Sequence, residues 1–447
     1  MKNIIKILNS NPSLVYTLLH RFSLIFSSGL VTILLPVFLG PEEQGFYYVF
    51  GSIAASQVLF ELGFGQIVLQ NVAYYSTGLL VNKKQQIDGD ADSLEKLSSV
   101  ILQISKWYLY VSTLFFVASV VFGYFLFEKK YPENRWSLLI PFIVFIASVA
   151  TNLYLASQIS ILEGLGQLGQ VSLQKIVQSV VSCAVSFMVL YFGGGLWVVI
   201  VAPIVNLILS LRFVKNKNRG FLLLVKRRVN TTAALNWRKD VLPLQIKLGI
   251  SWICGYFIHH VSTPVILINL GAAEAGAYGI TNTVVNSLHA IAFGCIHARL
   301  PKMVNFIALG DRRSLLELFR KSIAQALAVA LILIFGLIFA IWIGLAYKPK
   351  YFDRIAPFWV TFLLCVNLCA STAIASMAAF MRAHGEEPML LPTIVGAALS
   401  LPIVWYGSQS SLLIMVVLSV SANVFFGLPW TFILFQRYWR LGETFKR

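Results

Sequence analysis

LGPEEQGFYY, residues 39–48, interrupts a hydrophobic chain with a proline, two glycines and two adjacent glutamates. A related stretch, LGAAEAGAYG, occupies residues 270–279. Leucine, glycine, glutamate, glycine and tyrosine recur in the same order at a constant offset of 231 residues, and the same offset takes Gly63 to Gly294. Weak internal symmetry of this kind is typical of chains built from two similar halves.

The composition is that of a multi-pass membrane protein. Of the 447 residues, 58% are hydrophobic and only 12% are charged, whereas a soluble domain is roughly 25% charged. The net charge of +17 would suggest nucleic acid in a soluble protein. In a membrane protein it is explained by basic cytoplasmic loops, and we expect no nucleic-acid partner.

The hydrophobic stretches predict twelve membrane spans, since a span needs roughly 20 mostly apolar residues. With the N-terminus inside, the inner segments carry 23 Lys and Arg residues and the outer loops carry six. This bias predicts that both termini are cytoplasmic. The predicted spans lie near residues 14–39, 46–69, 101–127, 137–161, 171–192, 195–214, 245–270, 276–300, 322–347, 357–381, 388–407 and 411–435.

A basic segment, residues 215–240, divides the chain near its middle. Six spans separate the two copies of the repeat, and an even number gives both halves the same orientation in the membrane. We therefore expect an all-α membrane protein with twelve helices in two parallel six-helix lobes around a central cavity. Residues 1–214 form the N-lobe, 215–240 a cytoplasmic linker and 241–447 the C-lobe.

The residues of the first copy suit a tight extracytoplasmic turn better than an acidic binding site. Gly40 is expected to end the first helix in a left-handed cap. Pro41 suits the first position of the next helix, where no N–H donor is needed. Glu42 and Glu43 then fall in the first turn, where the helix dipole favours negative charge.

The L-G-x-x-E-x-G-x-Y pattern, with its second copy ahead of the segment LPKM at 300–303, resembles the Wzx-type polysaccharide flippases of the multidrug/oligosaccharidyl-lipid/polysaccharide (MOP) exporter superfamily. Length, span count and repeat extend the resemblance over the whole chain. It implies a V-shaped arrangement of two lobes in the bacterial inner membrane. It also implies an undecaprenyl-diphosphate-linked oligosaccharide as substrate, of the O-antigen, capsule or exopolysaccharide type. A polysaccharide polymerase, a chain-length regulator and membrane lipids are the implied partners.

Basic residues at membrane depth are candidate ligands for an anionic substrate. Arg21 lies about 10 Å beyond the start of the first span, at 1.5 Å per residue. Its planar guanidinium group suits a diphosphate, although an arginine there can also extend back to the inner headgroups. Lys175 and Lys247 lie a few residues inside the cytoplasmic ends of their spans, where they either extend to the interface or line the mouth of the cavity.

Glu61 is the glutamate placed well inside a span, so it either pairs with a buried cation such as Arg21 or exchanges a proton. His259 and His260 are further proton-coupling candidates, because histidine titrates in the physiological range. A hydrogen-bonded structural histidine is the alternative for each of them and for His289.

Two residues of the predicted eighth span complete the candidate substrate ligands. His289 lies deepest in the membrane, and we therefore place it in the lumen. Arg299 lies near the inner end of the span, where it either contributes to a cytoplasmic gate or meets lipid headgroups. The basic groups at membrane depth outnumber Glu61, and a cavity lined in this way prefers an anion.

Other functional classes fit the sequence less well. A multidrug efflux carrier of the same fold is the main alternative, but such a carrier is expected to need a buried carboxylate site, and no aspartate lies inside a predicted span. No catalytic constellation or glycine-rich phosphate loop is present, so we expect a transporter rather than an enzyme. The five cysteines have no metal-ligand spacing, and we expect no cofactor or metal.

Overall fold

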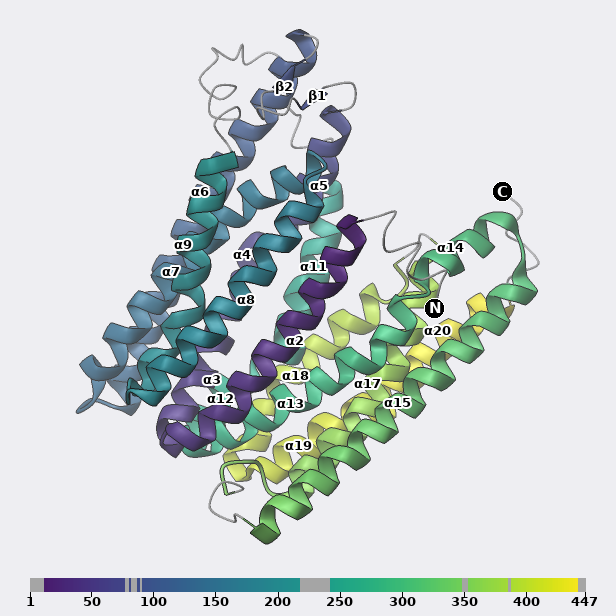
Figure 1. Ribbon diagram of the computed structural model, residues 1–447. Helices are drawn as coiled ribbons and strands as arrows, with labels where there is room; N and C mark the ends of the chain where they lie inside the picture. Colours follow the sequence, from purple (N-terminus) through teal and green to yellow (C-terminus); the bar gives the residue numbers. More distant parts are fainter. Residues whose placement is uncertain are drawn as a thin grey trace. The chain divides into compact units, whose positions relative to one another are not determined.

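The computed structural model describes residues 12–76, 80–81, 87–88, 91–217, 242–347, 353–384 and 387–440, and within them it is almost entirely helical (Figure 1). Two strands of two residues each, β1 (Leu80–Val81) and β2 (Ile87–Asp88), pair antiparallel. The predicted linker lies outside the described residues from position 218 onward. The helices are α2 (Pro12–Phe38), α3 (Pro41–Ala55), α4 (Gln57–Glu61), α5 (Phe64–Tyr75), α6 (Ala91–Lys130), α7 (Arg135–Gly164), α8 (Leu168–Tyr191), η1 (Gly195–Trp197), α9 (Val198–Lys217), α11 (Leu242–His259), α12 (Ser262–Asn269), α13 (Ala272–His297), α14 (Leu300–Leu309), α15 (Arg312–Tyr347), α17 (Phe358–Arg382), α18 (Leu390–Ser410), α19 (Leu412–Ser421), η4 (Ala422–Gly427) and α20 (Leu428–Arg440).

The chain divides into two compact units. Unit 1 comprises Met1–Leu39 and Phe50–Ile253, and unit 2 comprises Gly40–Val49 and Cys254–Arg447. The boundaries therefore fall between α2 and α3, within α3 and within α11. The expected division at residues 215–240 stays a prediction, because most of that segment lies outside the described residues.

Unit 1 is a bundle in which α7 packs against α5, α6, α8 and α9, and α2 packs along α8 (Figure 1). A hydrogen bond between the hydroxyl groups of Thr17 and Ser172 (3.2 Å) joins α2 to α8. The side chains of Phe50, Phe127 and Phe142 meet in its core, with ring centroids 4.9–5.8 Å apart. Aromatic rings at these separations pack more favourably than their buried area alone suggests.

Unit 2 is built around α13 and α17, which pack against each other and against α15, while α17 also contacts α19 and α20. Its core near α14 contains Phe319, Phe380 and Phe435, whose ring centroids are 4.6–5.4 Å apart. The guanidinium of Arg320 lies 5.0 Å from the Trp439 ring, a cation–π arrangement that binds α15 to α20.

The repeated turns have the helix-start chemistry that their residues favour, with one correction. Pro41 begins α3, Glu42 and Glu43 lie in its first turn, and the Gly40 N–H donates to the Glu43 carboxylate (3.0 Å), which satisfies a donor at the helix start. The expected left-handed Gly40 is not found. Positive φ occurs instead in the second copy, at Gly271 (φ 98°).

The glycines of the two repeat copies pack against each other where α3 crosses α13 in unit 2. A Cβ atom on Gly45 would lie 2.6 Å from the backbone carbonyl carbon of Ala272, and one on Gly276 would lie 2.8 Å from the Gly45 nitrogen. Gln44 extends across this crossing and donates to the Gly276 carbonyl (3.0 Å). The repeated glycine therefore permits direct backbone contact between the two helices.

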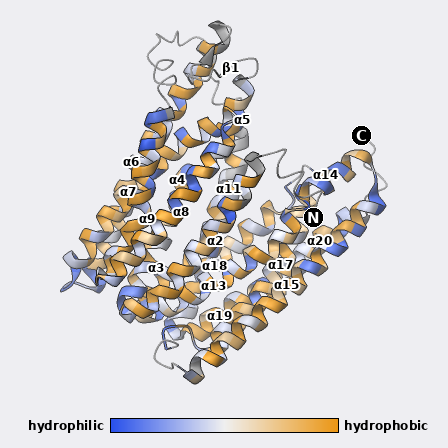
Figure 2. Ribbon diagram, viewed as in Figure 1, coloured by the Kyte–Doolittle hydropathy of each residue, from blue (hydrophilic) through white to orange (hydrophobic). Residues whose placement is uncertain are grey.

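Ten of the twelve predicted spans correspond to described helices long and apolar enough to cross a membrane, and these helices are mainly hydrophobic along their lengths (Figure 2). The remaining two are 46–69 and 276–300. The first is broken into α3, α4 and α5, and the second corresponds to α13, with 26 residues. The predicted span 245–270 is also interrupted, between α11 and α12.

Candidate functional site

A break in the predicted second span places Glu61 at a helix end. Leu62 and Gly63 follow it with φ values of 54° and 68°, both in the left-handed region, so α4 ends and α5 starts anew. A Cβ atom on Gly63 would lie 2.6 Å from Cδ1 of Trp252, and glycine is therefore needed both for its backbone and for this close approach. Broken helices at membrane depth are tolerated where they are buried in protein or line a cavity.

Glu61 is held by a buried tyrosine. The hydroxyl of Tyr108 on α6 donates to Oε1 of Glu61 (2.8 Å), and Tyr108 is only 1% exposed. Glu61 thus meets a neutral hydroxyl, and its pairing with a buried cation such as Arg21, one of the two alternatives that the sequence left open, stays a prediction. The second carboxylate oxygen is left for other contacts, and a proton-coupling role for Glu61 stays a prediction.

The Glu61 side chain lines a cavity inside unit 1. Its volume is about 600 Å³, within the range of pockets that hold small molecules. Small residues of α3, α7 and α9 keep it open, among them Gly51, Ala54, Ala156 and Ala202. Among its described lining residues Glu61 is the one with a charged side chain. The polar lining side chains are Gln57, Glu61, Asn152, Gln178, Asn206 and Ser210.

Two amides of this lining are fixed in orientation. Asn152 Nδ2 donates to the backbone carbonyls of Ser148 (2.9 Å) and Pro203 (2.8 Å). Gln178 Nε2 donates to the Asn206 carbonyl (3.2 Å) and the Ser210 hydroxyl (2.8 Å). Backbone carbonyls only accept, so the amide nitrogens must face them. The amide oxygens of both side chains remain as acceptors, and neither is among the buried unpaired atoms of the described residues.

Arg21 and Lys175 are not among the described residues that line this cavity. Arg21 is exposed on α2. Lys175 forms an ion pair with Glu163 (2.8 Å), which links α8 to α7. The side chain of Lys247 lies outside the described part of the chain. The cationic lumen expected between the two lobes is not this cavity, so the charge of that lumen and the substrate contacts of these three residues stay predictions.

The predicted residues of the second half lie in unit 2. Nδ1 of His289 on α13 is 2.9 Å from the Thr372 hydroxyl of α17. This is the kind of hydrogen bond expected of a structural histidine, and a place for His289 in the lumen stays a prediction. His259 and His260 are exposed beside the break between α11 and α12. Arg299 donates to the Ser322 hydroxyl (3.1 Å), which ties the start of α14 to α15.

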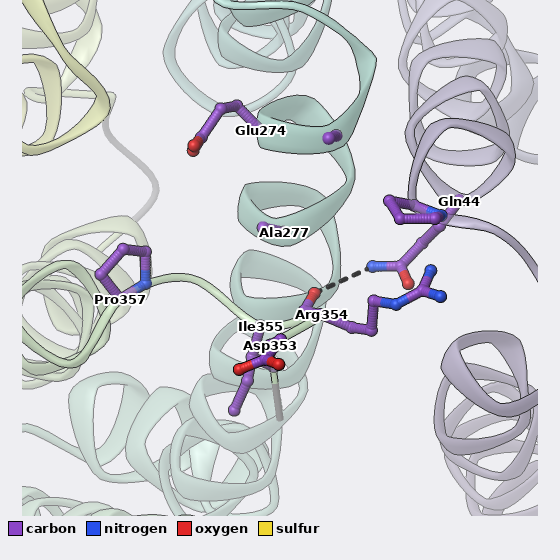
Figure 3. Close-up of a pocket in the computed structure, with 9 residues that line it drawn as sticks. Gln44, Glu274, Ala277, Asp353, Arg354, Ile355 and Pro357 are labelled. Carbon is purple, nitrogen blue, oxygen red and sulfur yellow. Dashed lines mark hydrogen bonds between the residues drawn. The ribbon is translucent and has the colours of Figure 1, made fainter. Parts of the chain in front are cut away.

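A smaller pocket of about 160 Å³ lies in unit 2 beside the repeat crossing. Gln44, Glu274, Asp353 and Arg354 surround it (Figure 3). Gln44 is 1% exposed, and besides its bond to α13 it donates to the Arg354 carbonyl (3.1 Å). Its amide nitrogen is thus fully used in holding the turn of α3 against the segment that precedes α17, and we interpret this residue as structural.

The comparison with known proteins identifies the fold. No family model and no curated protein matches the sequence. An inward-facing multidrug resistance MATE transporter of the MOP superfamily matches with a TM-score of 0.71 at 15% identity, over 95% of this chain and 96% of that one. The chain has the fold of a MOP-superfamily transporter.

Two other solved structures show how varied this superfamily is. The lipid II flippase MurJ, in an inward closed conformation, matches with a TM-score of 0.65 at 12% identity, over 95% of this chain and 87% of that one. A MOP-superfamily transporter from Pyrococcus furiosus, whose binding pocket is described as reversed in polarity, matches with a TM-score of 0.53 at 13% identity, over 96% and 97% of the chains. Identities this low establish the fold of this chain but not its substrate.

The sequence interpretation missed the amides of the unit 1 cavity. Asn152, Gln178 and Asn206 all lie in predicted spans, and polar side chains at membrane depth often mark substrate paths. Their presence was therefore a usable signal. The sequence could not show that α7, α8 and α9 turn these three side chains toward one cavity, because that depends on how the helices pack.

Proposed function

We propose that this protein is a flippase for undecaprenyl-diphosphate-linked oligosaccharides. It moves the repeat unit of an O-antigen, capsule or exopolysaccharide from the cytoplasmic to the periplasmic leaflet of the bacterial inner membrane. The observation that carries this proposal is the unit 1 cavity: in a transporter fold, it presents several uncharged amide and hydroxyl groups and a single carboxylate. Sugars are recognised by groups of this kind through hydrogen bonds.

The proposed mechanism is alternating access, in which one half of the molecule rocks against the other. The sugar passes through the polar interior while the prenyl tail stays in lipid. Arg21, Lys175, Lys247, His289 and Arg299 are the residues proposed to contact the substrate or guide its diphosphate. Both termini are proposed to be cytoplasmic, and a polymerase and chain-length regulator to act on the product outside.

The test is surface glycan display in the bacterial host. Deleting the gene should abolish display, and a plasmid carrying the wild-type gene should restore it. Arg21→Ala should reduce display at normal protein levels. The proposal fails if the deletion strain displays its glycan normally in the absence of a second flippase gene. Normal display by the Arg21→Ala variant would remove only the role given to Arg21.

Cation-coupled efflux is a second candidate function. Two observations favour it: the likeness to a multidrug resistance MATE transporter, and a carboxylate, Glu61, at a helix break inside a cavity. On this proposal Glu61 binds a proton or cation, with His259 and His260 as further coupling groups. Efflux predicts that expression lowers ethidium accumulation in cells and that Glu61→Gln abolishes the effect, whereas a dedicated flippase leaves ethidium accumulation unchanged.

A further inference from the structure

We infer that the unit 1 cavity binds the sugar portion of the substrate through hydrogen-bond acceptors and excludes its diphosphate. This inference rests on the proposed flippase function and goes further, because it assigns one part of the substrate to one group of residues. Arg21 and Lys175 are not among the described residues that line the cavity. Its components are the amide oxygens of Asn152 and Gln178 and the carboxylate of Glu61.

The protein itself has used up the amide donors of Asn152 and Gln178. Both N–H groups of the Asn152 amide go to backbone carbonyls of α7 and α9, and those of Gln178 go to α9. Glu61 accepts one hydrogen bond from Tyr108 and has a second oxygen. A ligand that contacts these three side chains therefore meets acceptors from α4, α7 and α8, and it must supply the donors to them.

A sugar meets that requirement and an ionised diphosphate does not. Each free hydroxyl of a sugar can donate one hydrogen bond, so one or two rings can engage all three acceptors. A diphosphate offers only acceptor oxygens and negative charge, and it would be repelled by the Glu61 carboxylate at low dielectric. The site thus separates the two polar parts of one substrate.

An organic cation is the competing kind of ligand for this cavity. It would also be attracted to the carboxylate, but sites for such cations commonly use the faces of aromatic rings. Phe145 is the one aromatic residue among the described lining residues. Two neutral amide acceptors on separate helices suit several hydroxyl groups better than one positive charge, and the chemistry therefore favours a neutral sugar.

The first test uses a steric block. Gly51 lines the cavity, and a Cβ atom there would meet nothing within 4 Å, so Gly51→Leu should fold and fill part of the space. Gly29 on α2 is also open and does not line the cavity, so Gly29→Leu is the matched control. The probe is the oligosaccharide repeat unit, released from its lipid by mild acid and labelled at its reducing end. Binding is measured on purified full-length protein in nanodiscs.

We expect the labelled repeat unit to bind wild type and Gly29→Leu equally, and Gly51→Leu at least tenfold more weakly. Inorganic pyrophosphate should not displace it. Equal binding by Gly51→Leu and wild type would overturn the inference, as would displacement by pyrophosphate. Displacement by tetraphenylphosphonium at a similar concentration would assign the cavity to organic cations and would likewise overturn it.

A second pair of variants tests the acceptors directly. Gln178→Met removes an acceptor from the cavity, and we expect about tenfold weaker binding. Gln158→Met is the control, because Gln158 on α7 is likewise a buried amide bonded to a neighbouring helix, at Ser105 (3.0 Å), but does not line the cavity. If both variants lose the same binding affinity, the loss comes from disturbed packing, and the acceptor role of Gln178 is wrong.

Glycan display separates the failure of this inference from the failure of the proposed function. If deletion abolishes display and the repeat unit still fails to bind the cavity, the flippase function stands and the sugar site is wrong. If deletion leaves display intact, the flippase function fails and the inference fails with it.

Discussion

The repeat glycine at the crossing of α3 and α13 gives the most direct test of how unit 2 is packed. In the variant Gly45→Ala, the new Cβ atom would lie 2.6 Å from the carbonyl carbon of Ala272 and 3.0 Å from its Cα atom. Carbon atoms pack best about 3.5 Å or more apart. The obstructing atoms are backbone and have no rotamer to change, so the two helices must separate by about 1 Å.

That separation has a second consequence, because Gln44 precedes the glycine. Its amide nitrogen donates to the Gly276 carbonyl at 3.0 Å, and a movement of about 1 Å takes this contact beyond hydrogen-bond range. Overpacking costs about 1–3 kcal/mol, and an unpaired buried polar group costs about 1–3 kcal/mol more. We therefore expect Gly45→Ala to destabilise the protein by roughly 2–6 kcal/mol.

Thermal unfolding of the purified protein in detergent, followed by size-exclusion chromatography, measures this effect. The control is Gly51→Ala on the same helix, where a Cβ atom would meet nothing within 4 Å. Replacing glycine by alanine inside a helix should stabilise the control by about 0.5–1 kcal/mol. If Gly45→Ala unfolds at the same temperature as Gly51→Ala, the direct backbone contact between the repeat copies is wrong.

Three further predictions concern single contacts, with thermal unfolding as the measurement for each. Gln44→Leu leaves two backbone carbonyls without their donor and should cost about 2 kcal/mol; an unchanged midpoint would contradict its clamping role. Gly63→Ala combines a left-handed backbone (φ 68°) with an approach of 2.6 Å to the Trp252 ring and should cost at least about 2 kcal/mol, part of which Trp252→Ala should restore. Tyr108→Phe removes the hydroxyl that donates to Glu61 and should cost about 1–3 kcal/mol; a variant that is as stable as wild type would show that the carboxylate does not need this donor.

Much of the architecture could be predicted from the sequence because it depends on local chemistry and on hydropathy. The membrane class followed from composition, and Pro41 and Glu43 indicated a helix start that the structure confirms. The all-helical MOP-type fold followed from the repeat and its resemblance. In each of these inferences the deciding residues lie close together in the chain or recur at a fixed offset.

The breaks in the helices could not be predicted in the same way. Gly63 was visible as a glycine, but Leu62 also adopts positive φ, which a leucine avoids unless its surroundings impose it. The break after His259 did have a signal that the sequence interpretation did not use, because Pro264 has no N–H to donate to the His260 carbonyl four residues earlier. The partner of Glu61 was equally hidden, because Tyr108 lies 47 residues away and reaches it only through the packing of α6 on α4.

The differences between the two halves are more informative about function than their likeness. The offset of 231 residues places Gly63 opposite Gly294 and Glu61 opposite Ala292. The first glycine is a left-handed break, whereas the second lies inside the continuous helix α13, and Ala292 is fully buried. The shared glycines at the turns preserve the crossing of the helices in both copies. The first copy departs from this pattern by opening its helix and adding a carboxylate, and that departure coincides with the polar cavity. The repeat thus gives the two halves similar helices. The residues around Glu61, where the first half departs from the repeat, are the ones we expect to contact the substrate.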